Sequence, residues 1–322
     1  MEDPSQKRFP RRPKIVYMGT PDFSVPTLKA LVERGHDVLA AVTQPDRPRG
    51  RGRKVIPSPV KDAAVNFGIK VLQPADVSAS PFLETMDSLM PDVFIVVAFG
   101  QILKRALLDL PRFGVINIHA SLLPKLRGAA PIQWAILNDE AGTGLTAMRM
   151  EEGLDSGPIL LQERVPILPD ETAGQLHDRL AVMAGVFLIR TLDGLAGNRL
   201  FERPQNHAAA THAPKIDRNM SLVNWNQPAE AVSALIRALD PWPGAVTTIN
   251  GEKIKLFSSQ VADRDRAGLP GRVTGQEEDT FEVEAGKGTV RIRELQLPGK
   301  RRLPAGRFLK GFALEKGTVL GT

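Results

Sequence analysis

The sequence contains no cysteine, one tyrosine and three tryptophans among its 322 residues. The lack of cysteine excludes disulfide bonds, thiolate catalysis and zinc sites built on cysteine. The five histidines are scattered and show no metal-ligand spacing, so we expect no metal. No apolar run approaches the roughly 18 residues of a membrane span, and residues 1–13 are polar and lack the apolar core of a signal peptide. We therefore expect a cytoplasmic protein whose residues 1–13 form a disordered, basic lead-in.

The length of the chain favours two domains. A hydrophobic content of 42% is enough for packed cores, and 24% charged residues is ordinary for a soluble protein. The net charge of +6 and the isoelectric point near 9.6 permit a polyanionic partner but do not require one.

The chain opens with a strand–turn–helix–strand pattern. An apolar strand at 14–18 leads into a glycine turn, a helix follows from about Ser24 to Arg34, and a second strand is expected at 38–42. The start of such a helix can receive an anion. The turn lacks the G-x-G-x-x-G spacing of dinucleotide-binding proteins, which disfavours a dinucleotide-dependent enzyme.

Strands and helices continue to alternate as far as a long helix over 172–195, which Thr172 would cap and in which Gly174 and Gly185 are mild defects. This alternation predicts an open, largely parallel sheet. Ligands of such sheets bind at the carboxyl ends of the strands. The loops that could share this edge are residues 19–24, 44–59, 98–101 and 119–128.

The composition changes at residues 202–217, which hold few apolar side chains and are expected to be a linker. A helix is expected at 228–239, and short strands separated by turns follow from residue 245. This spacing suggests a small β-barrel. Any single basic side chain in this part is more often part of a solvated face than of a binding site. These side chains are Lys253, Lys255, Arg291, Arg293, Lys300, Arg301 and Arg302.

The most informative stretch is residues 114–128. Its β-branched apolar residues predict a short buried strand. Asn117 and His119 are two positions apart, so their side chains lie on the same side of that strand. A lone histidine here would more often be a core residue hydrogen-bonded at the rim of the sheet.

Here two other polar side chains accompany the histidine. The Asn117 amide can donate to an oxyanion, and His119 can act as a base or as a cationic donor. Asp155 lies between Gly153 and Gly157, where backbone can approach closely. Together the three side chains would suffice to take a proton from an amine and to hold a tetrahedral oxyanion.

The second informative stretch is residues 44–59, a basic loop with a single acid, Asp46. Its prolines and glycines predict no regular structure. A solvated loop and a nucleic-acid contact are both compatible with this composition. Stacking on bases is not indicated, because no aromatic residue is interleaved. Its cations are Arg47, Arg49, Arg51, Arg53 and Lys54.

Four motifs stand out in the sequence: Asn117-Ile118-His119, Ser121-Leu122-Leu123-Pro124, Arg127-Gly128-Ala129-Ala130-Pro131-Ile132-Gln133 and Gly153-Leu154-Asp155-Ser156-Gly157. They resemble those of the 10-formyltetrahydrofolate-dependent formyltransferases, and the likeness covers nearly the whole chain from Lys14 onward. The 240–244 segment also resembles the family. The basic loop resembles that of the members that act on methionyl initiator tRNA, rather than the sugar-amine and glycinamide-ribotide members.

This resemblance implies an α/β fold, with a Rossmann-like formyltransferase domain at 14–201, the linker at 202–217 and an OB-like tRNA-binding domain at 218–322. It implies transfer of the formyl group of 10-formyltetrahydrofolate to the α-amine of methionyl initiator tRNA, without a metal or a covalent intermediate. Asn117, His119 and Asp155 would be the catalytic residues. The enzyme is expected to act as a monomer.

The resemblance also implies binding residues. Arg51 would contact the acceptor stem of the tRNA, and Arg47, Arg53 and Lys54 would support it through phosphates. Two alternatives remain open, a folate-dependent sugar-amine formyltransferase and a non-catalytic tRNA-binding protein on the same scaffold. Folate would dock along Phe99, Gly100, Gln101, Ile102, Ser121, Leu122, Leu123 and Pro124.

Overall fold

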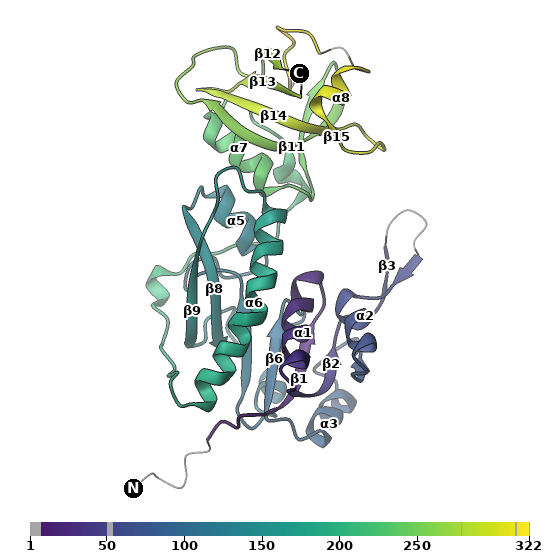
Figure 1. Cartoon of the computed structure of the whole chain (residues 1–322), viewed down its shortest axis with the longest axis vertical. Helices are drawn as coiled ribbons and strands as arrows, with labels where there is room; N and C mark the ends of the chain where they lie inside the picture. Colours follow the sequence, from purple (N-terminus) through teal and green to yellow (C-terminus); the bar gives the residue numbers. More distant parts are fainter. Residues whose placement is uncertain (1–7, 50–53, 278, 313, 322) are drawn as a thin grey trace. The chain divides into compact units, whose positions relative to one another are not determined.

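The computed structural model describes residues 8–49, 54–277, 279–312 and 314–321. Its contacts group the chain into two units (Figure 1). The N-terminal unit runs up to residue 128 and takes in residues 144–165 and 177–212. The C-terminal unit takes in residues 129–143, 166–176 and those from 213 onward. The chain crosses between the units several times, and its last crossing, after residue 212, falls within the expected linker. The domain limits 14–201 and 218–322 stay a prediction.

The N-terminal unit is built on a seven-stranded sheet with the order β5-β2-β1-β6-β7-β8-β9. The first five strands are parallel, and β8 runs antiparallel to β7. This confirms the open, mostly parallel sheet. Its strands are β1 (Lys14–Gly19), β2 (Asp37–Val42), β5 (Val71–Leu72), β6 (Val93–Val97), β7 (Val115–His119), β8 (Gly142–Arg149) and β9 (Ile159–Pro166).

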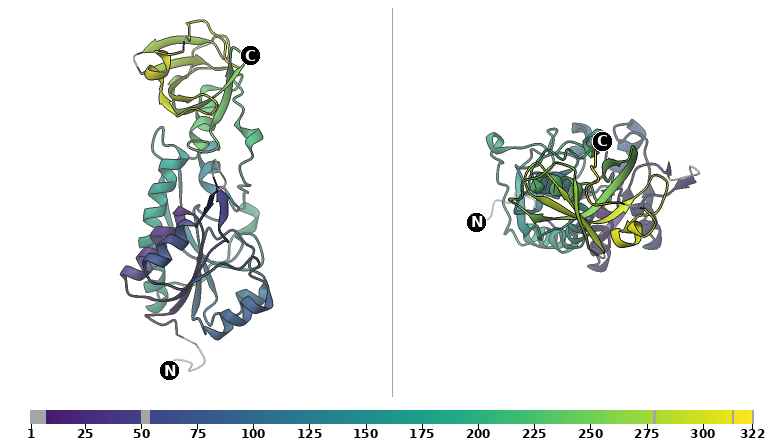
Figure 2. Two further views of the ribbon diagram at one scale, coloured as in Figure 1. Left: turned by 90° about the vertical axis from the view of Figure 1, so that its right-hand side faces the viewer. Right: turned by 90° about the horizontal axis from the view of Figure 1, so that it is seen from above.

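Helices cover both faces of this sheet (Figures 1 and 2), which is why the central strand β6 is apolar throughout. On one face, Phe82 and Met86 pack against Phe94 and Val96 of β6. None of the described helices is both long and apolar enough to cross a membrane. The helices are α1 (Val25–Glu33), α2 (Pro59–Asn66), α3 (Ser80–Ser88), α4 (Arg105–Leu108) and α6 (Ala173–Ala196), with a 3₁₀ turn, η1 (Asp22–Ser24), before α1.

The helix α6 begins as predicted after Thr172. The Gln175 N–H donates to the Thr172 hydroxyl (3.3 Å) and the Thr172 N–H donates to the Gln175 side chain (2.9 Å), a reciprocal cap. Gly185 is a close-contact position rather than a mere defect. A Cβ there would lie 3.0 Å from the Pro26 carbonyl oxygen and 3.3 Å from the Ala30 methyl group. The glycine thus allows α6 to pack against α1.

The expected lead-in, residues 1–13, is described only from residue 8. Phe9 is buried, and its ring lies 5.1 Å from the ring of Phe113. This aromatic contact joins the start of the described chain to the turn before β7.

The C-terminal unit contains an antiparallel sheet with the order β10-β11-β14-β13-β12, and β15 pairs with β14. The short strands expected from residue 245 onward are thus present, as an antiparallel sheet. Among the described residues the end strands β10 and β12 are not paired, so the sheet is not closed through them. Its strands are β10 (Ala245–Ile249), β11 (Glu252–Asp263), β12 (Val273–Glu277), β13 (Thr280–Glu284), β14 (Thr289–Gln296) and β15 (Leu303–Pro304).

Helices complete the core of the C-terminal unit. The indole of Trp134 in α5 (Pro131–Leu137) packs on a cluster that includes Ile236 of α7 (Ala229–Ala238) and Phe281 of β13. Phe308 of the short helix α8 (Ala305–Leu309) belongs to the same cluster.

Tyr17 provides a test of the core beneath the first turn. Its buried hydroxyl donates to the Ser24 carbonyl (2.5 Å) and lies 2.6 Å from the Thr27 hydroxyl. Burial raises the pKa of Tyr17 well above its usual value, so the hydroxyl keeps its proton. We predict that Tyr17→Phe lowers the free energy of unfolding by about 1 kcal/mol, measured by urea denaturation. Unchanged stability would contradict a role for this hydrogen bond.

Candidate active site

The candidate site lies at the carboxyl end of β7. Asn117 and His119 are both buried, at 8% and 7% exposure, on the same side of the strand. Asn117 is in register with Val96 of β6, and His119 with Thr146 of β8. The Asn117 side chain makes no hydrogen bond with any residue that the structure describes. A buried amide in this state is available to a ligand.

The His119 ring lies between two acceptors. Its Nε2 donates to the Leu126 carbonyl at 3.0 Å, because a carbonyl oxygen can only accept. Its Nδ1 lies 3.7 Å from Asp155 Oδ2, longer than a direct hydrogen bond. The same carboxylate oxygen accepts the Gly128 N–H at 2.8 Å. The predicted His119–Asp155 pair is therefore brought together, with a gap between the two side chains.

Close backbone approach around Asp155 agrees with the prediction made from its flanking glycines. A Cβ on Gly157 would lie 2.0 Å from the Arg149 carbonyl oxygen, so no larger residue fits without a shift. Asp155 itself has a positive φ of 48°. This backbone conformation is uncommon outside glycine, although aspartate tolerates it better than most residues.

The loop after β7 is fastened to the neighbouring strands. The Thr146 hydroxyl of β8 donates to the Ser121 carbonyl (2.6 Å) and accepts the Leu123 N–H (3.2 Å). The Gln162 amide of β9 donates to the Leu123 carbonyl (2.8 Å). The Ser121 hydroxyl donates within the loop to the Lys125 carbonyl (2.7 Å). These bonds fix the backbone of the loop after β7, which includes the Leu126 carbonyl that accepts the His119 hydrogen bond.

Two residues of the expected linker belong to this site, and both were missed in the sequence. The Gln205 amide donates to the carbonyls of Asp155 (2.8 Å) and Gly157 (2.7 Å), and its oxygen accepts the buried Arg127 guanidinium (2.7 and 3.2 Å). The Thr211 hydroxyl accepts the Leu126 N–H at 2.9 Å. The segment thus ties the Asp155 backbone to the loop after β7.

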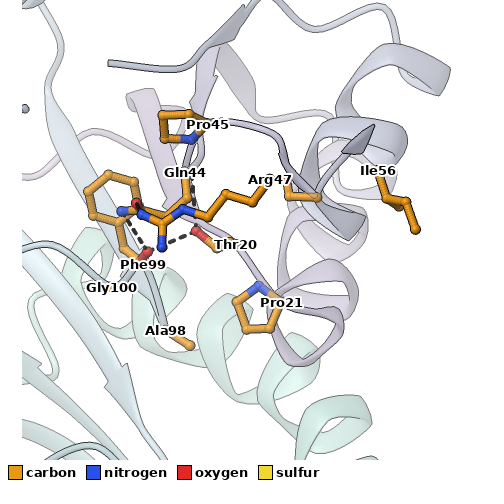
Figure 3. Close-up of a pocket in the computed structure, with 10 residues that line it drawn as sticks. Thr20, Pro21, Gln44, Pro45, Arg47, Ile56, Ala98, Phe99 and Gly100 are labelled. Carbon is orange, nitrogen blue, oxygen red and sulfur yellow. Dashed lines mark hydrogen bonds between the residues drawn. The ribbon is translucent and has the colours of Figure 1, made fainter. Parts of the chain in front are cut away.

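A cavity of about 310 Å³ opens at the carboxyl ends of β1, β2 and β6 (Figure 3). The Thr20 hydroxyl donates to the Phe99 carbonyl (2.8 Å) and accepts the Gln44 N–H (3.3 Å), which joins the three strand ends. None of Asn117, His119 and Asp155 lines it. Its lining residues are Thr20, Pro21, Gln44, Pro45, Arg47, Ile56, Ser58, Ala98, Phe99 and Gly100.

The expected folate-binding residues do not all line this cavity. Phe99 and Gly100 line this cavity. The Gln101 side chain instead accepts the Val77 N–H (3.1 Å) and donates to the Pro74 carbonyl (3.2 Å), which joins the loop to the residues before α3. Ile102 is 83% exposed. Ser121, Leu122, Leu123 and Pro124 lie in the fastened loop after β7.

The basic loop contains a short hairpin, so the prediction of no regular structure was wrong at its two ends. Strands β3 (Arg47–Arg49) and β4 (Lys54–Ile56) pair antiparallel. Both are edges of a two-stranded ribbon, where Pro48 is tolerated, and β4 carries β-branched residues. Arg51 and Arg53 lie outside the described residues, as does the side chain of Lys54. Arg47 is exposed, and its guanidinium donates to the Gln44 side chain (3.3 Å).

An ion pair holds the base of this hairpin. The Asp46 carboxylate accepts the Lys61 ammonium group and the Gln73 amide (2.8 Å), and Gln73 also donates to the Gln44 carbonyl (2.9 Å). The hydrogen bond from Lys61, and next that from Gln73, hold the pKa of Asp46 below its usual value. The only acid of the loop therefore anchors it to α2 and to the residue that follows β5.

Comparison with known proteins gave consistent matches along the chain. The sequence profile of the formyl transferase family matches residues 13–192, and that of the formyl transferase C-terminal domain matches residues 215–313. The chain is 46% identical over 308 residues to the methionyl-tRNA formyltransferase of Moorella thermoacetica (96% of this chain, 99% of the relative). It is 48% identical over 307 residues to that of Pelobacter propionicus (95% of this chain, 96% of the relative).

A solved structure shares the fold. HypX from Aquifex aeolicus, solved in complex with tetrahydrofolic acid, superposes with a TM-score of 0.63 over 92% of this chain and 47% of HypX. The two sequences are 17% identical, so this likeness concerns the fold alone.

Gln205 provides a test of the tie between the expected linker and the site. We predict that Gln205→Ala lowers the free energy of unfolding by about 1–3 kcal/mol, because the buried Arg127 guanidinium keeps only its contact with His207 Nδ1 (3.2 Å) and the Asp155 and Gly157 carbonyls lose their donor. Urea denaturation measures the change, and the matched control is Asn206→Ala, whose side chain is exposed. Equal effects of the two substitutions would contradict the tie.

Asp46 provides a test of the hairpin anchor. We predict that Asp46→Asn speeds hydrogen exchange of the β3 and β4 amides, while the exposed Asp62→Asn, which removes the same charge, does not. Because the pKa of Asp46 is lowered in the fold, its contribution is present above the unfolded-state pKa and is lost as pH falls through the lower folded-state pKa. Exchange that is unchanged in Asp46→Asn would contradict the anchor.

Proposed function

This chain belongs to the formyl transferase family, and we infer from its relation to methionyl-tRNA formyltransferases that it transfers a formyl group to the α-amine of methionyl initiator tRNA, for translation initiation. Both family profiles are matched, and the relatives are aligned over nearly their full length. The formyl donor is 10-formyltetrahydrofolate. The observation that carries the assignment at the level of the site is the set of Asn117, His119 and Asp155, with the Asn117 amide left free.

The reaction at this site needs one oxyanion and one proton transfer. The amine attacks the formyl carbon, so a carbon–nitrogen bond forms and the formyl oxygen becomes an oxyanion. The free Asn117 amide donates to that oxygen, and the protonated His119 ring donates beside it. The intermediate then collapses, the bond to the folate nitrogen breaks, and that nitrogen takes up the proton lost by the amine.

Asp155 supports the proposed proton transfer through its position. The 3.7 Å between its carboxylate and His119 Nδ1 leaves room for a bridging atom, either the amine or a water. The Gly128 N–H holds the carboxylate in place at 2.8 Å, and Leu126 holds the far side of the ring. Both reacting groups are thus oriented before the substrate arrives, which favours the transition state.

Folate is proposed to lie between the strand ends and the loop after β7. The cavity walls at Phe99 and Gly100 offer apolar surface and a glycine backbone. Gln101 and Ile102 follow directly, and the Ser121–Pro124 loop borders the strand that carries Asn117. HypX, which shares the fold, was solved with tetrahydrofolic acid, and this supports the class of cosubstrate.

The tRNA is proposed to meet the basic hairpin. Arg51 would contact the acceptor stem, with Arg47, Arg53 and Lys54 contacting phosphates. The exposed Arg47 at the rim of the cavity supports this placement. We further propose that the protein acts in the cytoplasm as a monomer.

The assay that tests the function is formyl transfer from 10-formyltetrahydrofolate to methionyl initiator tRNA. Elongator methionyl-tRNA and a UDP-amino-sugar are run beside it at two salt concentrations. Formylation of the initiator alone, weakened by salt, is the expected result. Turnover of the sugar would favour the sugar-amine alternative, and tRNA binding without turnover would favour the non-catalytic one.

Asn117 provides the sharpest test of the mechanism. We predict that Asn117→Ala lowers kcat by about 100-fold or more and changes the KM values little, because its amide acts on the oxyanion. His119→Ala should behave in the same way. Steady-state kinetics with both substrates measure the split, and thermal unfolding confirms that the variants fold. Raised KM values with an unchanged kcat would contradict the role.

A further inference from the structure

A second cavity, of about 380 Å³, lies entirely within the C-terminal unit. Its walls come from the end of α5, the segment that follows β9, one face of α7, and β11 with the residues after it. The α7 positions that line it are 230, 233 and 237, and this helical spacing places their side chains on the same face of the helix. No residue of the candidate active site lines this cavity. Its volume is typical of sites for small molecules.

The buried charge of this cavity belongs to Arg237, whose side chain is 11% exposed. Its Nε is buried and has no hydrogen-bond partner among the residues that the structure describes. One terminal nitrogen donates to the Glu171 carbonyl (3.3 Å), and the other lies 3.7 Å from Asp139 Oδ1, too far for a hydrogen bond. A buried guanidinium with so few bonds is destabilising unless an acceptor binds it.

The pKa of Arg237 reflects this environment. Burial, its largest cause, lowers the pKa below the usual value, while the nearby Asp139 and Asp170 carboxylates act in the opposite direction. The guanidinium nevertheless keeps its charge at neutral pH. An anionic group bound to Arg237 would therefore stabilise a charge that the described residues solvate poorly.

The acids that line the cavity are more exposed than its guanidinium. The Asp139 side chain is 70% exposed, Asp170 is also exposed, and Glu140 is half-buried. The Glu230 carboxylate accepts the Arg264 guanidinium at 2.7 Å, so these two charges balance each other. The cavity thus combines one buried positive charge with a surplus of more exposed negative charge.

The remaining walls of the cavity are mainly apolar. Leu168 is 50% exposed, so an apolar group that covers it is removed from water together with it. The Ile167 N–H donates to the Ala141 carbonyl (3.2 Å), which joins the segment after β9 to the segment after α5. The apolar residues of these walls are Ile136, Ala141, Ile167, Leu168, Pro169 and Val261.

We propose that this cavity, named the Arg237 cavity, binds a free α-amino acid with an apolar side chain. The carboxylate of the ligand accepts hydrogen bonds from Arg237, its ammonium group donates to Asp139 or Asp170, and its side chain lies on the apolar walls. An α-amino acid carries both charges on one carbon atom, so a cation and an acid that lie close together match it. A simple anion would face the exposed acids, and a simple cation would face Arg237.

The test is isothermal titration calorimetry of the full chain with L-leucine. This probe is used instead of L-methionine, because free methionine resembles the acceptor of the proposed reaction and can occupy the active site. We expect saturable binding with a Kd of about 1 mM or lower. L-Leucine amide lacks the carboxylate and N-acetyl-L-leucine lacks the ammonium group, so each should bind at least about tenfold more weakly.

Substitutions test whether the binding occurs in this cavity. Arg237→Leu should weaken L-leucine binding about tenfold to hundredfold, because the carboxylate loses its charged donor. Asp139→Asn/Asp170→Asn should also weaken it, and asparagine tolerates the positive φ of 50° and 58° at these positions. The matched control is Arg218→Leu, which removes an exposed guanidinium of the same unit outside the cavity and should bind as the wild type does.

The proposal does not depend on the proposed function, because formyl transfer is not measured. Asn117→Ala should bind L-leucine normally, and a loss there would place the ligand in the active site and overturn the proposal. No binding by the wild type, equal binding of either analogue, or unchanged binding in Arg237→Leu would also overturn it. Thermal unfolding checks that each variant folds. If Arg237→Leu does not fold, the two analogues and Asp139→Asn/Asp170→Asn decide the outcome.

Discussion

The site depends on one carboxylate, that of Asp155. It accepts the Gly128 N–H and faces the His119 ring, so it links the loop after β7 to the loop between β8 and β9. Neither loop has regular secondary structure, and this contact joins the two directly, beside the hydrogen bonds that hold each of them to neighbouring segments. The electrostatic environment of the candidate site is therefore set by a bond to backbone as much as by the side chains of Asn117, His119 and Asp155.

The backbone on both sides of this contact is in turn held by residues distant in the sequence. Gln205 bonds the backbone at Asp155 and the guanidinium of Arg127, and Thr211 bonds the backbone at Leu126. The segment that leads to the C-terminal unit thus helps to set the geometry of the candidate site. This arrangement suits an enzyme whose substrate is far larger than its active site, because supporting contacts keep the reacting groups oriented.

Part of this structure was predictable from the sequence, where local periodicity carries the information. The alternation around Asn117 and His119 placed both side chains on one side of a buried strand, and the structure confirms it. Gln205 and Thr211 were not predictable, because their partners lie 78 and 85 positions away and no local pattern encodes such contacts. The hairpin at Arg47 was missed because the strand preference of Val55 and Ile56 outweighs the prolines around them.

The measurement that tests the account most directly is ¹⁵N NMR of the His119 ring in the free enzyme, assigned by comparison with His119→Gln. The account requires that Nε2 carries a proton, because it donates to the Leu126 carbonyl, and that Nδ1 faces Asp155. A protonated Nε2 that exchanges slowly with solvent is the predicted result. A ring protonated only at Nδ1 would contradict the orientation on which the proposed chemistry depends.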